Sequence, residues 1–193
     1  VVYCWINNIT MIIYNERQRG VTTLMSLLTI HSNLSIYHGG KVKQIQPSRT
    51  IRDYQLNRVK AITSLLPPYI RNELELNSLV PLFSSPNVAK MTEIAELLSP
   101  VSLILDDAPY LKCQDILLKG IVERSKTVPN RNSTFKRYGA DIVILPETHI
   151  DTPNKWRTGL EEVLGDGRVI ETADFNKPYN PGEFKLALIN YTK

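Results

Sequence analysis

The segment from Asn15 to Thr23 carries residue types suited to binding phosphate. It follows an apolar run at residues 11–14 and contains one glycine, Gly20, before two threonines and an apolar segment that continues to about residue 31. A strand, a glycine-containing loop and a helix start, in this order, form the layout of a phosphate-binding P-loop. Backbone N–H groups at such a helix start bind phosphate oxygens, and a hydroxyl helps to hold Mg²⁺. The segment therefore predicts a nucleotide-phosphate site.

Two positions of this segment depart from the usual P-loop pattern. Asn15 stands at the first glycine, and Val21 stands where a lysine normally contacts the phosphates. A valine side chain cannot donate a hydrogen bond, so the charge of the phosphates would need another cation. An ordinary helix start is the alternative interpretation of residues 20–23, because threonine caps helices and glycine is common in the preceding loop.

A pair of carboxylates, Asp106 and Asp107, directly follows the apolar run at residues 101–105. This order resembles a Walker B pattern, in which the first carboxylate holds Mg²⁺ through its water shell and the second positions the water that attacks the γ-phosphate. Because many buried strands end in acidic residues, the pattern gains meaning only from the P-loop-like segment that precedes it.

Short apolar segments alternate with helical patterns along the chain. We expect strands at residues 11–14, 34–37, 101–105, 140–145, 168–172 and 184–189, and one strand or a hairpin within residues 74–83. We expect helices at residues 22–31, 50–66, 91–98, 115–122 and 156–164. This alternation predicts an α/β fold, a P-loop NTPase-like three-layer sandwich with a mostly parallel central sheet.

Three polar clusters follow strands of that expected sheet. They are the segment 15–23, the pair Asp106 and Asp107, and the pair Glu147 and Thr148. Ligands of parallel α/β sheets bind at the carboxyl ends of the strands. We therefore expect these clusters to meet in one site.

Length and composition predict a single domain over residues 1–193. Hydrophobic residues make up 42% of the chain, and 23 Lys and Arg against 19 Asp and Glu give a net charge of +4, which is compatible with a nucleic-acid partner without requiring one. Cys4 and Cys113 lie far apart without a zinc-site spacing. No apolar run approaches the roughly 20 residues of a membrane span, so we expect a cytosolic, soluble protein without a membrane partner.

Five segments, taken in order, resemble the ATPase domain of the large terminase subunit, the DNA-packaging motor of tailed bacteriophages. Residues 17–23 keep the fixed positions of that family's variant P-loop, Arg-Gln-x-Gly-x-Thr/Ser-Thr. Residues 58–70, 84–90 and 106–110 are similar to a helix with a Leu-Pro turn, a Ser-Pro segment and an Asp-Glu-x-Ala-Phe motif. Residues 142–148 and 152–154 are similar to the coupling strand and its Thr-Pro-Asn turn. The resemblance spans about residues 9–160.

The resemblance implies a role for each matching residue. The nucleotide cradle would be Arg17, Gln18, Arg19, Gly20, Val21, Thr22 and Thr23. Arg17 would supply the charge that Val21 lacks and act in catalysis, and Arg19 is a second candidate. Asp106 and Thr22 would hold Mg²⁺, Asp107 would be the catalytic carboxylate, and Thr148 would sense the γ-phosphate and couple hydrolysis to movement.

The resemblance also implies what the chain works with. ATP and Mg²⁺ would be its cofactors, double-stranded DNA its substrate, and a homo-oligomeric ring on a capsid portal in the host-cell cytoplasm its setting. We expect no counterpart of the family's nuclease domain within these 193 residues. Asp107 replaces the family's glutamate, and Lys90 and Met91 replace its Arg-Gly. Two alternatives stay open: a degenerate P-loop domain with weak or no ATP hydrolysis that serves assembly, and a helicase-like translocase.

Overall fold

The structure is a computed structural model that describes residues 1–16, 20–34, 42–74, 76–97, 102–126, 140–170 and 183–191. The described strands are β1 (Thr10–Asn15), β2 (Val42–Gln46), β3 (Leu82–Phe83), β4 (Ser102–Leu105), β5 (Ile142–Pro146), β6 (Arg168–Ile170) and β7 (Leu186–Tyr191). The α-helices are α1 (Val2–Ile6), α2 (Val21–Leu34), α3 (Arg49–Ser64), α4 (Pro68–Arg71), α5 (Val88–Thr92), α6 (Gln114–Lys126) and α7 (Lys155–Leu164). Shorter 3₁₀ or π segments are η1 (Leu76–Leu79), η2 (Glu93–Leu97), η3 (Ala108–Tyr110) and η4 (Glu147–His149).

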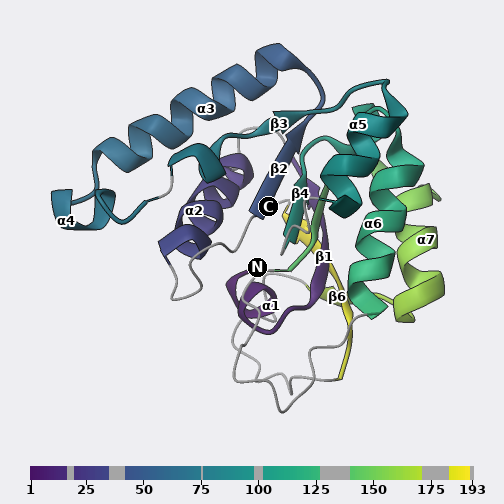
Figure 1. The fold of residues 1–193 in the computed structure, drawn as a ribbon. Coiled ribbons are helices and arrows are strands. Elements are labelled where there is room, and N and C mark those ends of the chain that lie inside the picture. The colour runs from purple at the N-terminus through teal and green to yellow at the C-terminus, as the bar shows by residue number, and fades with distance from the viewer. Residues whose placement is uncertain are drawn as a thin grey trace.

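The described strands form one seven-stranded sheet in the order β3-β2-β4-β5-β1-β7-β6 (Figure 1). Every neighbouring pair in this sheet is parallel. Parallel strands need crossover connections, and helices supply most of them here. The predicted α/β class with a parallel central sheet is confirmed.

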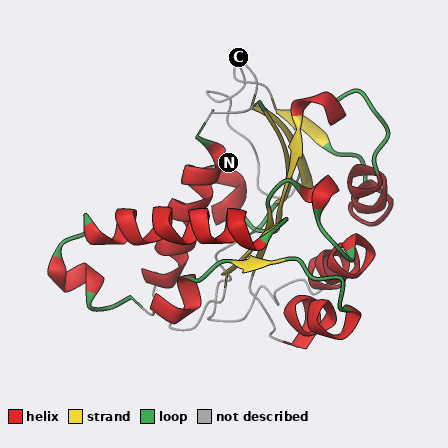
Figure 2. Cartoon of the chain, turned by 90° about the horizontal axis from the view of Figure 1, so that it is seen from above, coloured by secondary structure: helices red, strands yellow, loops and turns green. Residues whose placement is uncertain are grey.

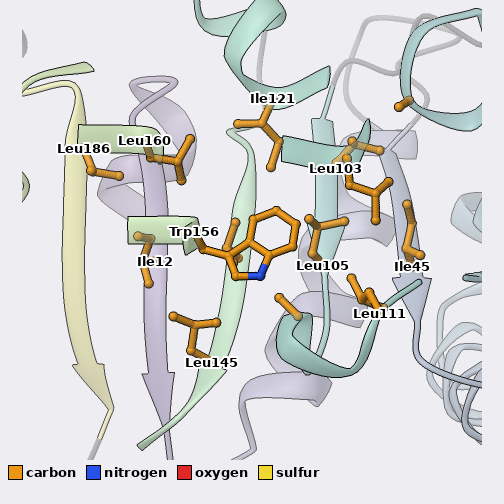
Figure 3. Packing of buried hydrophobic residues seen from close by; sticks show 14 of the residues in the cluster. Ile12, Ile45, Leu103, Leu105, Leu111, Ile121, Leu145, Trp156, Leu160 and Leu186 are labelled. Carbon is orange, nitrogen blue, oxygen red and sulfur yellow. The ribbon is translucent and has the colours of Figure 1, made fainter. Parts of the chain in front are cut away.

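Helices cover both faces of the sheet. Successive side chains of a strand point to opposite faces, so one strand contributes apolar side chains to both. In β1, Ile12 and Tyr14 belong to the apolar cluster beneath α5, α6 and α7, whereas Met11 and Ile13 belong to the cluster beneath α1 and α2. Figure 2 shows the two groups of helices on opposite sides of the strands. Trp156 of α7 lies among the residues of the first cluster (Figure 3). The result is the predicted three-layer sandwich.

Helix α3 lies outside the helix layer that contains α1 and α2, and it packs against α2. Val59 of α3 packs with Ile30 of α2 in a smaller apolar cluster that Leu74 and Leu79 complete. The helix begins after Ser48, whose hydroxyl oxygen accepts a hydrogen bond from the Ile51 amide at 3.3 Å. This packing fixes the position of the α3 face that is turned toward the carboxyl ends of the strands.

The chain leaves two neighbouring strands toward opposite faces of the sheet. After β1 it continues into α2 on one face, and after β5, which pairs with β1, it continues into α7 on the other. Such a point opens a crevice at the carboxyl ends of the two strands, and ligands of parallel sheets bind there.

Most predicted elements are confirmed, and three segments differ. The helix expected at residues 91–98 begins earlier, at Val88, and passes after Thr92 into the π segment η2, while residue 98 lies outside the described part of the chain. Residue 34 ends α2 rather than starting a strand, and residues 35–37 lie outside the described part of the chain. The second strand in sequence is β2, at Val42–Gln46. Within residues 74–83, only Leu82–Phe83 is a strand, and Leu76–Leu79 forms a 3₁₀ turn. None of the described helices has the length and apolar character that crossing a bilayer requires.

Candidate functional site

A pocket of about 790 Å³ lies at the carboxyl ends of β1, β4 and β5, within the size range of small-molecule sites. Its lining residues come from the ends of these three strands and from two helices. They are Asn15, Glu16, Thr22, Thr50, Ile51, Tyr54, Gln55, Arg58, Asp106, Asp107, Tyr110, Pro146, Glu147 and Thr148. Three segments that are distant in sequence therefore meet where the sequence predicts a site.

One wall of the pocket is the start of α2. Gly20 has φ +78°, and a Cβ built on it would meet no atom within 4 Å, so its backbone conformation rather than crowding favours glycine. The Gly20 carbonyl accepts a hydrogen bond from the Leu24 amide at 2.9 Å, which begins the helix. Thr22, in the first turn, lines the pocket. The first N–H groups of a helix have no partner within that helix, and they can bind an anion.

Val21 and Thr23 occupy the same turn without lining the pocket. The Val21 side chain is 1% exposed and belongs to the apolar cluster between α2 and the sheet. Its side chain is therefore not available to a ligand at the helix start. Thr23 is exposed. The remaining predicted cradle residues, Arg17, Gln18 and Arg19, lie outside the described residues.

The two carboxylates after β4 have different environments. Asp106 is buried, and its backbone N–H donates to the Ile45 carbonyl at 3.1 Å. Burial, together with the negative charge of Asp107, raises the pKa of Asp106 from 3.8 to about 6, against a smaller opposing effect of a hydrogen bond from Gln46 and the charge of Arg58.

Asp107 is exposed and has a left-handed backbone, with φ 47° and ψ 51°. Aspartate tolerates this region better than most residues. Its backbone turns the chain from β4 into η3, and the carboxylate lines the pocket. A buried carboxylate and an accessible one thus stand side by side.

Thr148 enters the pocket from the end of β5. It lies in η4, is exposed, and lines the pocket beside Glu147. The chain then turns into α7, where the Asn154 side chain accepts from the Arg157 amide at 2.9 Å and caps the helix. Asp106, Asp107, Thr22 and Thr148 therefore share one pocket.

The opposite wall is a face of α3 that the sequence interpretation did not assign to the site. Thr50, Ile51, Tyr54, Gln55 and Arg58 recur at helical spacing and all line the pocket. Tyr54 is 77% exposed, whereas Gln55 is 2% exposed. The signal in the sequence was this spacing of polar and aromatic residues, but nothing local to α3 indicates that its face meets β4.

The pocket is acidic within the part of the chain that the structure describes. Glu16, Asp106, Asp107 and Glu147 line it together with one cation, Arg58. Two buried oxygens beside these carboxylates lack a hydrogen-bond partner, Asn15 Oδ1 at the pocket wall and Gln46 Oε1 on β2. Carboxylate, amide and hydroxyl oxygens are ligands for hard divalent cations.

These donors fit a Mg²⁺ ion that is held jointly by protein and phosphate. In the described part of the chain, no three Asp, Glu, His or Cys side chains are grouped to hold a metal together. Mg²⁺ in nucleotide sites usually takes one or two carboxylates and completes its shell with phosphate oxygens and water. Asp106 and the Thr22 hydroxyl can serve in this way.

The sequence matches no protein-family model, and no curated protein resembles it at a significant level.

Proposed function

We propose that this chain is an ATP-hydrolysing P-loop domain of the large terminase type, which couples Mg²⁺-ATP hydrolysis to translocation of double-stranded DNA into a capsid. One observation carries the proposal: Thr22, the Asp106–Asp107 pair and Thr148 line a single pocket at the carboxyl ends of three parallel strands. A helix start for phosphates, a carboxylate pair and a hydroxyl just after the intervening strand together suit phosphoryl transfer.

The residues divide the chemistry between them. The amides of the first turn of α2 bind phosphate oxygens, and Asp106 with the Thr22 hydroxyl would hold Mg²⁺. Bound Mg²⁺ neutralises charge that develops on the phosphate oxygens. Asp107, exposed to the pocket, would orient a water molecule and accept its proton as the water oxygen attacks the terminal phosphorus, while the bond from that phosphorus to the bridging oxygen breaks and ADP leaves. Thr148, in η4 directly after the strand between β4 and β1, contacts the terminal phosphate and responds to its loss.

The remaining parts of the proposal follow from the resemblance. The motor would act as a homo-oligomeric ring on a capsid portal in the host cytoplasm, and isolated chains would turn over slowly. The net charge of +4 is compatible with a DNA partner.

The test is ATP turnover with Mg²⁺, with and without double-stranded DNA, for the native chain and for Asp107→Asn. We expect the variant to lose about 100-fold or more in kcat while its affinity for ATP changes little, because a positioned proton acceptor contributes at least that much. Asp151→Asn is the matched control, since Asp151 is exposed near the same edge and does not line the pocket. Equal turnover in native chain and Asp107→Asn would exclude Asp107 as the catalytic carboxylate.

A second candidate is a degenerate P-loop domain that binds nucleotide weakly and serves assembly. Burial of Val21 in the core favours it, because the position of the usual lysine supplies no side chain to the pocket. No turnover, and no binding at millimolar Mg²⁺-ATP, would decide for this alternative.

A further inference from the structure

We propose that Arg58 is a phosphate-binding residue of this pocket, held in place by a buried hydrogen-bond relay that joins α2, β2 and α3. The inference rests on the proposed nucleotide site and names a cation for it that lies on α3, outside the P-loop-like segment. Gln55 would be the positioning residue that orients Arg58.

The relay consists of two buried glutamines, Gln44 on β2 and Gln55 on α3, which are 3% and 2% exposed. Gln44 Nε2 donates to the Thr29 hydroxyl at 2.6 Å and to the Met25 carbonyl at 3.0 Å, both on α2. Its Oε1 accepts a hydrogen bond from Gln55 Nε2 at 3.0 Å. Because each amide is fixed by its partners, neither glutamine is free to turn.

Gln55 connects this relay to the pocket. Its Nε2 donates to the Ser26 hydroxyl at 2.6 Å and lies 3.3 Å from the Thr22 carbonyl oxygen, in the first turn of α2. Its Oε1 accepts from Arg58 Nη1 at 3.1 Å. The guanidinium is therefore tied to the helix start that would bind phosphate.

The guanidinium of Arg58 keeps donors for a ligand. It has five N–H groups in a planar fork, and the structure gives it one hydrogen bond, to Gln55. Among the described residues, no carboxylate lies within ion-pair distance of it. Arg58 is half-buried and lines the pocket, where its charge also lowers the pKa of Asp106. A phosphate at the start of α2 would be an acceptor for the remaining donors.

The described part of the pocket is acidic, which favours a cation beside the phosphates. Four described carboxylates line it, and the side chain of Val21 is committed to the core. A polyphosphate entering this field needs positive charge besides that of Mg²⁺. Arg58 supplies it from the wall formed by α3.

The first experiment measures binding of Mg²⁺-ATP, and separately of Mg²⁺-tripolyphosphate, to the native chain and to Arg58→Gln. We expect Kd to rise about tenfold to a hundredfold for both ligands, because losing a charge-assisted hydrogen bond commonly weakens binding by that factor. Equal losses for the two ligands would show that Arg58 contacts phosphate rather than the base. Lys60→Gln removes the same charge from an exposed position of α3 that does not line the pocket, and it is the matched control.

Two further variants test the relay. Arg58→Lys keeps the charge without the fork, so its Kd should fall between those of the native chain and Arg58→Gln. Gln55→Met keeps Arg58 but removes the hydrogen bond that orients its guanidinium. Adding Arg58→Gln to Gln55→Met should therefore weaken binding by a smaller factor than Arg58→Gln does in the native chain. Thermal unfolding of each variant checks that the fold is retained.

The outcomes separate this inference from the function on which it rests. Failure of the native chain to bind either ligand would overturn both. Native binding with equal Kd for Arg58→Gln and Lys60→Gln would overturn the role of Arg58 alone. The role of Arg58 alone would also be overturned if Arg17→Gln abolished binding while Arg58→Gln left the Kd unchanged.

Discussion

The buried carboxylate Asp106 should destabilise the protein without its ligand, and Asp106→Asn should therefore raise the free energy of unfolding at neutral pH. Its pKa rises from 3.8 to about 6 on folding, a shift of about 2 units. At 1.36 kcal/mol per unit, this corresponds to about 3 kcal/mol at full ionisation. Asparagine keeps an oxygen that can accept a hydrogen bond from Gln46 and carries no charge to bury.

The sign of the pH dependence follows from proton binding. Between pH 3.8 and about 6 the folded state holds the proton of Asp106 and the unfolded state has lost it. The free energy of unfolding should therefore fall as pH rises through this window and stay low above it. The stabilisation by Asp106→Asn should be largest above pH 6 and small below pH 4.

The assay is urea denaturation in EDTA, at pH 5 and pH 7.5. Asp107→Asn is a second variant for this assay. It removes the neighbouring charge that helps to raise the pKa of Asp106, but it leaves the buried carboxylate in place. We therefore expect it to raise the free energy of unfolding less than Asp106→Asn does. Adding Mg²⁺-ATP should stabilise the native chain more than Asp106→Asn, since ligand that binds only the folded state stabilises it. If Asp106→Asn proved less stable than the native chain at pH 7.5 in EDTA, the reasoning would be refuted.

Three substitutions test the framework around the site by urea denaturation. Gly20→Ala should lower the free energy of unfolding by about 1–2 kcal/mol through backbone strain alone, because its φ is +78° and its Cβ would meet nothing; no loss would show that the loop adopts another conformation. Asp141→Asn should lower it by about 3–5 kcal/mol, because buried Asp141 pairs with partly buried Arg124 at 3.1 Å. Gly159→Ala places a Cβ 2.7 Å from Leu118 Cδ2, so the end of this half-buried side chain must shift, and the substitution should lower the free energy of unfolding by about 1 kcal/mol at most. A neutral result for Asp141→Asn would contradict the ion pair with Arg124, and a loss well above about 1 kcal/mol for Gly159→Ala would show that Leu118 cannot move.

The strands that carry the site were predictable because they are buried on both faces. β1, β4 and β5 are mostly apolar, and polar residues that line the pocket lie at the end of each strand or directly after it. For a parallel sheet, that pattern predicts where the strand lies in the sequence. It also predicts that the residues after the strand lie at the carboxyl edge of the sheet. The joint position of Asp106 and Thr148 could thus be inferred without coordinates.

β2 and the α3 wall could not be inferred in the same way. Lys43, Gln44 and Gln46 interrupt the apolar pattern of β2, and burial of Gln44 depends on partners in α2 and α3 that lie 15 and 11 residues away. The role of Arg58 depends in turn on Gln55. Such long-range polar pairing leaves no periodic trace in the sequence.

The left-handed backbone of Asp107 also decides which carboxylate the chain can carry there. Aspartate and asparagine occupy that region more readily than other non-glycine residues, whereas glutamate lacks the short side chain that can bond locally. Replacing Asp107 by glutamate would therefore lengthen the side chain by one methylene and also strain the backbone at this position. Asparagine shares the backbone preference of aspartate, so Asp107→Asn changes charge while leaving the turn after β4 intact.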